Sequence, residues 1–192
     1  MTRKFTFGEI VSGQVFQIGL VVPDVDVAMR FYADVMKIGP FTCNRGFRAP
    51  DGWYRGKLDM PELTITHAHT GSLFIELIQQ HDDTPSVYTE FTDKHGYGLH
   101  HLGIAVAPEE FEKVMAHYYG LGFEDVFTDN LPSGARIRYI APNSEAAIEK
   151  LRNDTGVGYF EIVEIVDLEE IFFTKMYEAS LNWDGKTILR ER

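Results

Sequence analysis

Four polar residues stand inside apolar, strand-like segments, where side chains of their kind are costly to bury. Gln17 and His101 lie at the start of two such segments, and Glu76 and Glu161 lie within two others. A buried carboxylate needs a cation or another charged partner. One imidazole, one amide and two carboxylates form a nitrogen and oxygen ligand set that suits zinc, nickel, cobalt or manganese. The residue types therefore predict a site for one divalent metal ion.

The four residues hold matching places in an internal repeat. The segment Phe16 to Tyr32 aligns with His100 to Tyr119, and each reads as a strand, a proline-containing break and an amphipathic helix. Gln17 aligns with His101 at an offset of 84 residues, and the two glutamates align at an offset of 85. Taken singly, each residue also has a simpler interpretation, such as a hydrogen-bonded core histidine or a charge on a strand edge. One shared site explains the symmetry better.

Each half of the repeat is expected to contain a strand, a helix and three further strands. In the first helix, Val27, Phe31 and Val35 share one face. The expected segments are an N-terminal segment (1–13), a first module (14–80), a helical linker (81–98), a second module (99–166) and a C-terminal helix with its tail (167–192).

Three connecting segments carry their own signals. The insert Arg48 to Glu62 contains a Pro-Asp-Gly turn signal and is expected to be a loop. The linker helix is expected to begin at Asp83 or Thr84 as its N-cap. The C-terminal helix is expected to run from about Leu168 to Leu181.

Side chains alternate between the two faces of a strand. Gln17 and Gly19 therefore share a face of one strand, and His101 and Gly103 share a face of another. The small residue two places on leaves room beside each polar side chain for something other than a side chain. His100 is expected to point to the opposite face.

Composition excludes several classes of protein. The chain has 18 basic and 29 acidic residues and a net charge of -11, which argues against nucleic-acid binding. No apolar run approaches the length of a membrane span. The lone Cys43 can form no internal disulfide, and the start lacks the apolar run of a signal peptide. A cytoplasmic protein is expected.

At these residues the sequence resembles the vicinal oxygen chelate superfamily, which includes glyoxalase I, methylmalonyl-CoA epimerase, extradiol dioxygenases and bleomycin-resistance proteins. The resemblance covers about residues 14–166 and rests on the segments IGLVVPDVDVAMRFYADVMKIGPF, IELIQQ, GLHHLGIAV and FEIVEI. It implies an α+β fold of two tandem βαβββ modules, whose curled mixed sheet surrounds a central metal site, followed by a C-terminal helix. It also implies that the four residues Gln17, Glu76, His101 and Glu161 bind the metal.

The same resemblance implies a reaction. Glyoxalase I and methylmalonyl-CoA epimerase both remove a proton next to a carbonyl while a metal stabilises the enolate, and Glu76 and Glu161 would be the catalytic carboxylates. The expected substrate is a small carbonyl compound, such as a thioester or a thiol adduct, and a homodimer is expected. Two alternatives stay open: a drug-sequestering protein of the same fold, and an extradiol-type dioxygenase. The dioxygenase is less favoured because its iron site uses two histidines and one glutamate.

The sequence departs from the epimerases in the third strand of the first module, where those enzymes carry an additional acid. Here Thr64 or a neighbour stands at that place, and His67 and His69 on the same strand are candidates to meet the substrate instead. Trp53 in the insert and Arg138 in the second module are two further candidate substrate-binding residues. Each of these also has a plainer interpretation as a covering or solvent-facing side chain.

Overall fold

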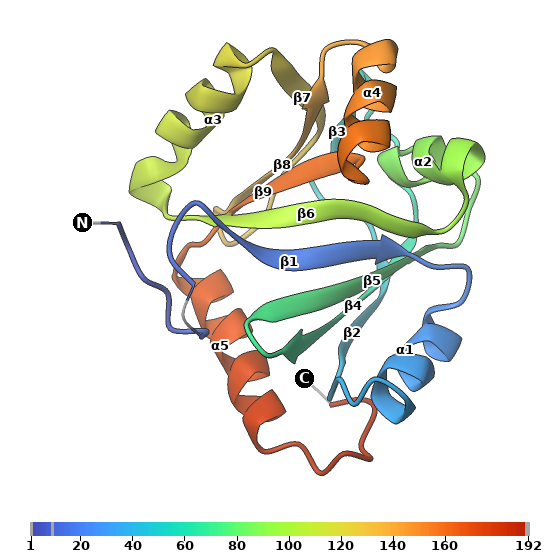
Figure 1. Ribbon diagram of the computed structural model, residues 1–192, viewed down its shortest axis with the longest axis vertical. Coiled ribbons are helices and arrows are strands. Elements are labelled where there is room, and N and C mark those ends of the chain that lie inside the picture. The colour runs from blue at the N-terminus through green and yellow to red at the C-terminus, as the bar shows by residue number, and fades with distance from the viewer. Residues whose placement is uncertain (1, 9, 191–192) are drawn as a thin grey trace.

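One curled sheet organises the molecule. The computed structural model describes residues 2–8 and 10–190 of the chain. Within them, nine strands form a single sheet in the order β2-β4-β5-β1-β6-β9-β8-β7-β3, and helices surround it (Figure 1). The elements are β1 (Gln14–Val21), α1 (Val25–Asp34), β2 (Thr42–Phe47), β3 (Trp53–Tyr54), β4 (Leu63–Thr70), β5 (Leu73–Gln80), α2 (Val87–His95), β6 (Gly98–Val106), a 3₁₀ turn (Pro108–Glu110), α3 (Phe111–Gly120), β7 (Phe123–Asn130), β8 (Arg136–Pro142), α4 (Glu145–Thr155), β9 (Tyr159–Glu164) and α5 (Asp167–Leu181).

The sheet has two similar halves that meet at its centre. Strands β1 and β6 pair antiparallel there. On one side β1 pairs parallel with β5, and on the other side β6 pairs parallel with β9. Outward from the centre, each half then adds two antiparallel strands, β4 and β2 or β8 and β7. The predicted α+β fold, with its curled mixed sheet and C-terminal helix, is confirmed.

Helices α1 and α3 take equivalent places in the two halves. Helix α3 buries Phe111 and Met115 in a cluster with Ile140 and Ile162. Helix α1 makes the matching contact with the first half, through Val25 and Met29. The next residues along the same strands, Phe74 beside Ile75 and Val163 beside Ile162, pack with α5 instead, so α5 lies on the other face of the sheet from α1 and α3.

The face of α1 predicted to share apolar side chains is not the buried one. Val27, Phe31 and Val35 are 53–63% exposed, while Val25, Met29 and Ala33 are buried. Both sets repeat every four residues, so helical periodicity alone does not distinguish them. Val27, Phe31 and Val35 share a face as expected, but that face is the exposed one.

The insert between β2 and β4 is more than a loop. Its residues Trp53–Tyr54 form the short strand β3, which pairs antiparallel with β7 at the far edge of the other half, so that Tyr54 lies opposite Phe127. Tyr54 and Met60 from this insert belong to the same buried cluster as Tyr139 of the second half. Turn residues predicted a loop because they report local geometry and not a distant strand partner.

Two helical features also differ from expectation. Helix α2 begins after Ser86, whose side chain accepts hydrogen bonds from the backbone of Tyr88 and Thr89, both at 3.1 Å, so neither Asp83 nor Thr84 is its N-cap. Helix α4 was not expected, although Ser144 caps its start and Gly156, with φ of +77°, ends it.

Helix α5 closes one end of the sheet together with the N-terminal segment. Phe173 of α5 lies 5.4 Å from Phe7, 5.1 Å from Phe16 and 5.0 Å from Phe74, measured between ring centroids. These rings are almost completely buried, so residues before the first module contribute to the core. Of the helices formed by the described residues, none combines the length and hydropathy that crossing a bilayer requires.

We expect the Phe173→Ala substitution to lower the free energy of unfolding by about 3–5 kcal/mol, because it leaves a cavity between the rings of Phe7, Phe16 and Phe74. The matched control is Ile171→Ala on the same helix, which removes a side chain that is 50% exposed and is expected to cost within about 0.5 kcal/mol. Urea unfolding measures both. Equal effects of the two variants would contradict the packing of α5 described above.

Candidate metal centre

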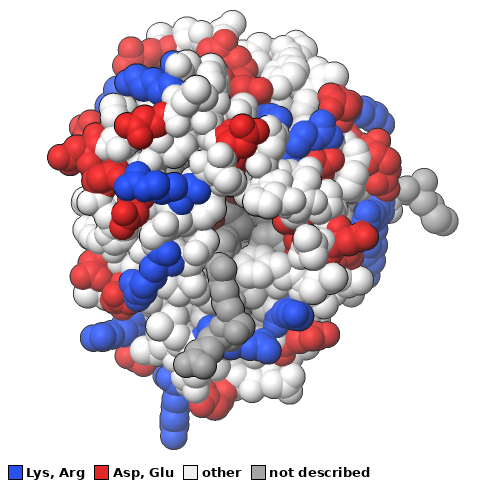
Figure 2. Space-filling model, turned by 180° about the vertical axis from the view of Figure 1, so that it is seen from behind, with Lys and Arg blue, Asp and Glu red and all other residues white. Residues whose placement is uncertain are grey.

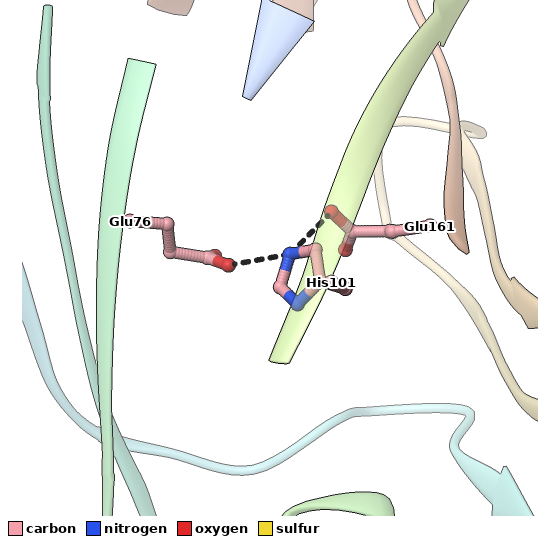
Figure 3. Close-up of side chains that lie close together, drawn as sticks. All are labelled: Glu76, His101 and Glu161. Carbon is pink, nitrogen blue, oxygen red and sulfur yellow. Dashed lines mark ion pairs between the residues drawn. The ribbon is translucent and has the colours of Figure 1, made fainter. Parts of the chain in front are cut away.

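Four polar side chains converge at the centre of the sheet. Glu76, Gln17, His101 and Glu161 come from β5, β1, β6 and β9, which are adjacent strands in that order. His101 Nε2 lies 3.1 Å from Glu76 Oε2 and 3.3 Å from Glu161 Oε2 (Figure 3). The amide nitrogen of Gln17 donates to the same two carboxylate oxygens, at 3.1 and 2.9 Å. All four residues are at least 95% buried.

Two glycines make this convergence possible. In the register of the sheet, Gly19 lies between Glu76 and His101, and Gly103 lies between Gln17 and Glu161. A Cβ at Gly19 would overlap the ring of His101, and one at Gly103 would come within 2.8 Å of Gln17 Cβ. The expectation that each glycine leaves room for something other than a side chain was wrong, because a ligand side chain from the neighbouring strand fills the space.

A β-bulge precedes the polar residue in each half. On β6, His101 pairs with Gly19 but Leu99 pairs with Leu20, so His100 is the extra residue. On β1, Phe16 is the extra residue before Gln17 in the same way. Alternation fails at a bulge. His100 therefore lies beside His101, with 3.0 Å between their Nδ1 atoms, and the expectation that it points to the opposite face was wrong.

The hydrogen bonds of His100 fix which nitrogen of His101 faces the centre. His100 Nε2 lies 3.2 Å from the carbonyl oxygen of Val87, which can only accept, so this nitrogen carries the hydrogen. Burial, followed by the nearby His101, holds the pKa of His100 well below its usual value, so its Nδ1 is an acceptor. His101 then donates from Nδ1. Its Nε2 is left for the two carboxylates or for a metal ion.

The charges at the centre are strongly coupled. Burial alone would lower the pKa of His101, but the carboxylates of Glu161 and Glu76 raise it to about 9. Burial would raise the pKa of Glu76, but the hydrogen bonds from His101 and His67 outweigh it and bring the pKa well below its usual value. In the protein alone, a proton on His101 therefore provides the positive charge that the carboxylates need.

The same donor set fits a divalent metal ion. One nitrogen of His101 and one oxygen each of Glu76 and Glu161 all lie within 4.8 Å of one another. Counting both carboxylates as anions, a protonated His101 leaves this buried group with a charge of −1, whereas a divalent ion bound to neutral His101 would neutralise it. Gln17 could add a fourth ligand through its amide oxygen if the amide, which now presents its nitrogen, turned over. Imidazole and carboxylate ligands suit zinc and its neighbours.

The two carboxylates have different neighbours on their outer sides. His67 lies directly opposite Glu76 in the pairing of β4 with β5, and His67 Nε2 is 3.1 Å from Glu76 Oε1. Tyr139 holds the equivalent place opposite Glu161. Its hydroxyl pairs instead with that of Tyr88, at 3.4 Å. Among the described residues, none donates a hydrogen bond to Glu161 Oε1. Both carboxylate oxygens of Glu76 therefore have a partner, whereas only one oxygen of Glu161 has one.

A cavity of about 840 Å³ adjoins the centre, and the two glutamates, Gln17 and His67 are among its lining residues. The other three candidate substrate-binding residues lie elsewhere in the described part of the chain. His69 is covered by α5, 3.2 Å from Ser180 Oγ. Trp53 pairs with β7. The guanidinium of Arg138 donates to the carbonyl oxygens of Asp129 and Ile137 and to Asn130 Oδ1. None of the three lines the cavity.

Sequence reasoning did not find Tyr88 and Tyr139, which line the cavity and surround His100. Tyr139 lies opposite Glu161, as His67 lies opposite Glu76. The repeat alignment does not reveal this equivalence, because helix α4 lies between β8 and β9 and shifts the offset from 85 residues at the glutamates to 72 at His67 and Tyr139.

The chain is similar to a known protein superfamily. The model of the glyoxalase/bleomycin resistance protein/dioxygenase superfamily matches residues 16–141. A search of curated proteins gave no match. Among solved structures, a hypothetical protein from Bacillus halodurans is 19% identical, with a TM-score of 0.56, covering 81% of this chain and 96% of that one.

Two epimerases have similar folds. The methylmalonyl-CoA epimerase from Mycobacterium tuberculosis is 20% identical with a TM-score of 0.51, covering 81% of this chain and 89% of that one. A Streptomyces coelicolor methylmalonyl-CoA epimerase, in complex with 2-nitronate-propionyl-CoA, is 17% identical with a TM-score of 0.53, covering 82% and 98%. At these identities the likeness is one of fold. The family match covers most of the chain, which therefore belongs to the glyoxalase/bleomycin resistance protein/dioxygenase superfamily, the vicinal oxygen chelate superfamily.

We expect Gly19→Ala to displace the ring of His101, because the new Cβ would occupy the place of that ring. The substitution should lower the free energy of unfolding by roughly 1–3 kcal/mol and remove most of the bound metal. In the control, Gly120→Ala, no heavy atom lies within 4 Å of the new Cβ, and at this helical position alanine should be neutral or stabilising by up to about 1 kcal/mol. Metal analysis and urea unfolding measure both, and normal metal content in Gly19→Ala would contradict this geometry.

We expect the stability of chelator-treated protein to fall between about pH 6.5 and 9. The pKa of His101 is raised in the folded state to about 9, so its contribution is complete below the ordinary value and is lost as the pH rises through the folded value. Glu76 acts at the acidic end of the pH range, because its pKa is lowered in the folded state. Its contribution to stability is present above its ordinary pKa and is lost as the pH falls through the folded value. In His101→Phe the fall should be shallower, whereas the exposed His117→Gln should keep it. The free energy of unfolding, measured across the pH range, tests this expectation. Identical pH dependence in the wild type and in His101→Phe would refute it.

Proposed function

We propose that the protein is a metal-dependent enzyme that removes a proton from the carbon next to a carbonyl group and returns it to complete an epimerisation or isomerisation. The observation that carries this proposal is the pair of glutamates, which belong to the donor set of a buried metal centre and also line a large cavity. A purely structural metal site is closed by its ligands, whereas a catalytic site keeps access to substrate.

The role of a bound divalent ion follows from its charge: it would polarise the carbonyl oxygen of the substrate and stabilise the negative charge that develops there. Gln17, Glu76, His101 and Glu161 would hold it. His100 keeps the correct nitrogen of His101 turned toward it, through the hydrogen bonds to Val87 and His101.

Glu161 is the base in this proposal. Its Oε1 receives no hydrogen bond from the described residues, and the side chain lines the cavity, so this oxygen is free to take a proton from carbon. Glu76 approaches from another strand, and its Oε1 is held by His67. We assign to Glu76 and His67 together the return of a proton to the enolate. Return to the same carbon from the other side gives epimerisation, and return to the neighbouring position gives isomerisation.

The size of the cavity also supports a second candidate function, a drug-sequestering protein without metal chemistry. The two functions differ in what they require of the centre. Sequestration needs only the walls of the cavity, so it would tolerate the loss of both glutamates, whereas the enzyme would not. An extradiol-type dioxygenase would instead hold oxygen-sensitive iron. Elemental analysis of protein purified without added metal or chelator separates the three.

We expect Glu161→Gln to keep its metal, because the amide oxygen can replace the carboxylate oxygen as a ligand, but to slow the exchange of substrate hydrogen with solvent deuterium by about 100- to 10,000-fold, the usual contribution of a general base. His67→Gln should lose less, about 10- to 100-fold, because His67 acts through Glu76. The matched control is His69→Gln, on the same strand but outside the cavity, which should exchange normally.

The measurement is NMR in D₂O with methylmalonyl-CoA and with 2-hydroxyacetophenone as test carbonyl compounds. Metal-free wild-type protein that exchanges as fast as the loaded protein would overturn the proposal. So would Glu161→Gln with unchanged exchange. Absence of exchange with both compounds in a protein that binds no metal would favour sequestration.

A further inference from the structure

The cavity beside the metal centre carries information on the substrate, and this inference rests on the function proposed above. Its volume of about 840 Å³ is at the upper end of the range for small-molecule sites. A reacting carbonyl with the atoms next to it fills only a small part of that space. Figure 2 shows a hollow near the middle of the face opposite to that of Figure 1. The remaining volume must hold the body of the substrate.

The walls around that body are mainly apolar and come from both halves of the sheet. Phe47, Leu63 and Ile65 line it from the first half, and Phe127 and Ile137 line it from the second. Helix α5 adds Phe172 beside the metal centre, where its ring lies 5.9 Å from that of His67. An apolar wall of this extent binds by removing apolar surface from water.

The charged residues of the wall are mostly acidic. Apart from the two glutamates of the centre, three carboxylates line the cavity: the buried Asp129, the partly buried Glu169 and the exposed Glu178. Asp129 is 1% exposed, and its Oδ1 accepts the backbone N–H of Asp51 at 3.0 Å. Glu169 accepts from Ser133 Oγ at 2.7 Å through Oε1, while its Oε2 is buried without a hydrogen-bond partner in the described residues. A negatively charged substrate body would meet these groups unfavourably.

The two basic residues of the wall do not neutralise these carboxylates in the interior of the cavity. Lys175 and Arg190 are both exposed, and Arg190 also donates a hydrogen bond to the backbone carbonyl oxygen of Lys175, at 3.1 Å. Recognition of phosphate or carboxylate groups usually relies on arginine and lysine with several converging donors. The described cavity wall offers no such group inside.

We propose that the substrate is an uncharged carbonyl compound with a large apolar body, such as one or two aromatic rings or a long alkyl chain, and that it is not a CoA thioester. The carbonyl end lies at the metal centre, and the apolar body lies between Phe127 and Ile137 on one side and Phe47 and Ile65 on the other. This assignment departs from the epimerases of similar fold.

Three hydroxamic acids test this assignment, because they share one metal-binding group and differ only in the body. The probes are acetohydroxamic acid, 2-naphthohydroxamic acid and the monohydroxamate of succinic acid, titrated calorimetrically into metal-loaded protein. We expect the naphthyl compound to bind at least 100-fold more tightly than the acetyl compound. The anionic succinyl compound should bind no more tightly than the acetyl compound. A naphthyl compound within threefold of the acetyl one, or a preference for the succinyl one, overturns the proposal.

Variants of one helix locate the effect. Phe172→Ala should weaken the binding of the naphthyl compound at least fivefold and leave the binding of the acetyl compound unchanged, because Phe172 lines the cavity. The neighbouring Ile171→Ala, which changes a side chain outside the cavity, should bind both as the wild type does. Equal loss of both compounds in Phe172→Ala would show damage to the metal centre and would overturn the assigned position of the body.

The experiment separates failure of this inference from failure of the proposed function. If metal loading does not change the affinity for acetohydroxamic acid, the metal site fails, and the naphthyl preference measured on metal-free protein still decides the nature of the cavity. If methylmalonyl-CoA exchanges deuterium with a higher kcat/KM than 2-hydroxyacetophenone, the enolate chemistry stands and the uncharged substrate class is overturned.

Discussion

Two carboxylates buried in the middle of a sheet impose the condition on which the rest of this structure depends. Glu76 and Glu161 lie in a setting where an isolated negative charge would be very unfavourable. They are tolerated because His101 lies between them and Gln17 donates to both. Any arrangement that separated the four strands would take His101 and Gln17 away from both carboxylates and leave Glu76 with His67 alone. The antiparallel pairing of β1 with β6 is therefore both the junction of the two halves and the support of the site.

The backbone meets this condition with small irregularities. A bulge before Gln17 and another before His101 re-aim the strands at equivalent places, and a glycine in each strand gives the opposing ligand its space. The extra residues of the two bulges, Phe16 and His100, have different roles. Phe16 packs under α5 in an aromatic core, whereas His100 forms the hydrogen-bonded support of His101. The same geometry thus serves packing in one half and ligand orientation in the other.

The ligand set and the fold could be predicted from the internal repeat in the sequence. The ligand set followed from aligned polar residues in apolar strands, and the fold followed from the repeated pattern and the resemblance it carries. Features set by long-range contacts were not predictable in this way. A bulge moves His100 without altering the apolar pattern. Trp53 and Tyr54 pair with residues of β7 that lie 75 and 73 positions further along the chain, and the buried face of α1 has the same period as its exposed one. Helix α4 was missed although its capping residues were visible, because the repeat predicted only strands there.

The short strand β3 alters how the two halves relate to each other. It belongs to the first half by sequence but extends the sheet of the second, and Tyr54 and Met60 of its segment are buried against second-half residues. A chain built by repeating one unit could in principle be divided again into two self-sufficient copies. Here the edge strand of the second half, β3, is supplied by the first half, and β3 has no strand to pair with unless β7 of the second half is present. Neither half therefore contains the complete set of strands that it packs with, and the two similar parts share one sheet and one buried cluster.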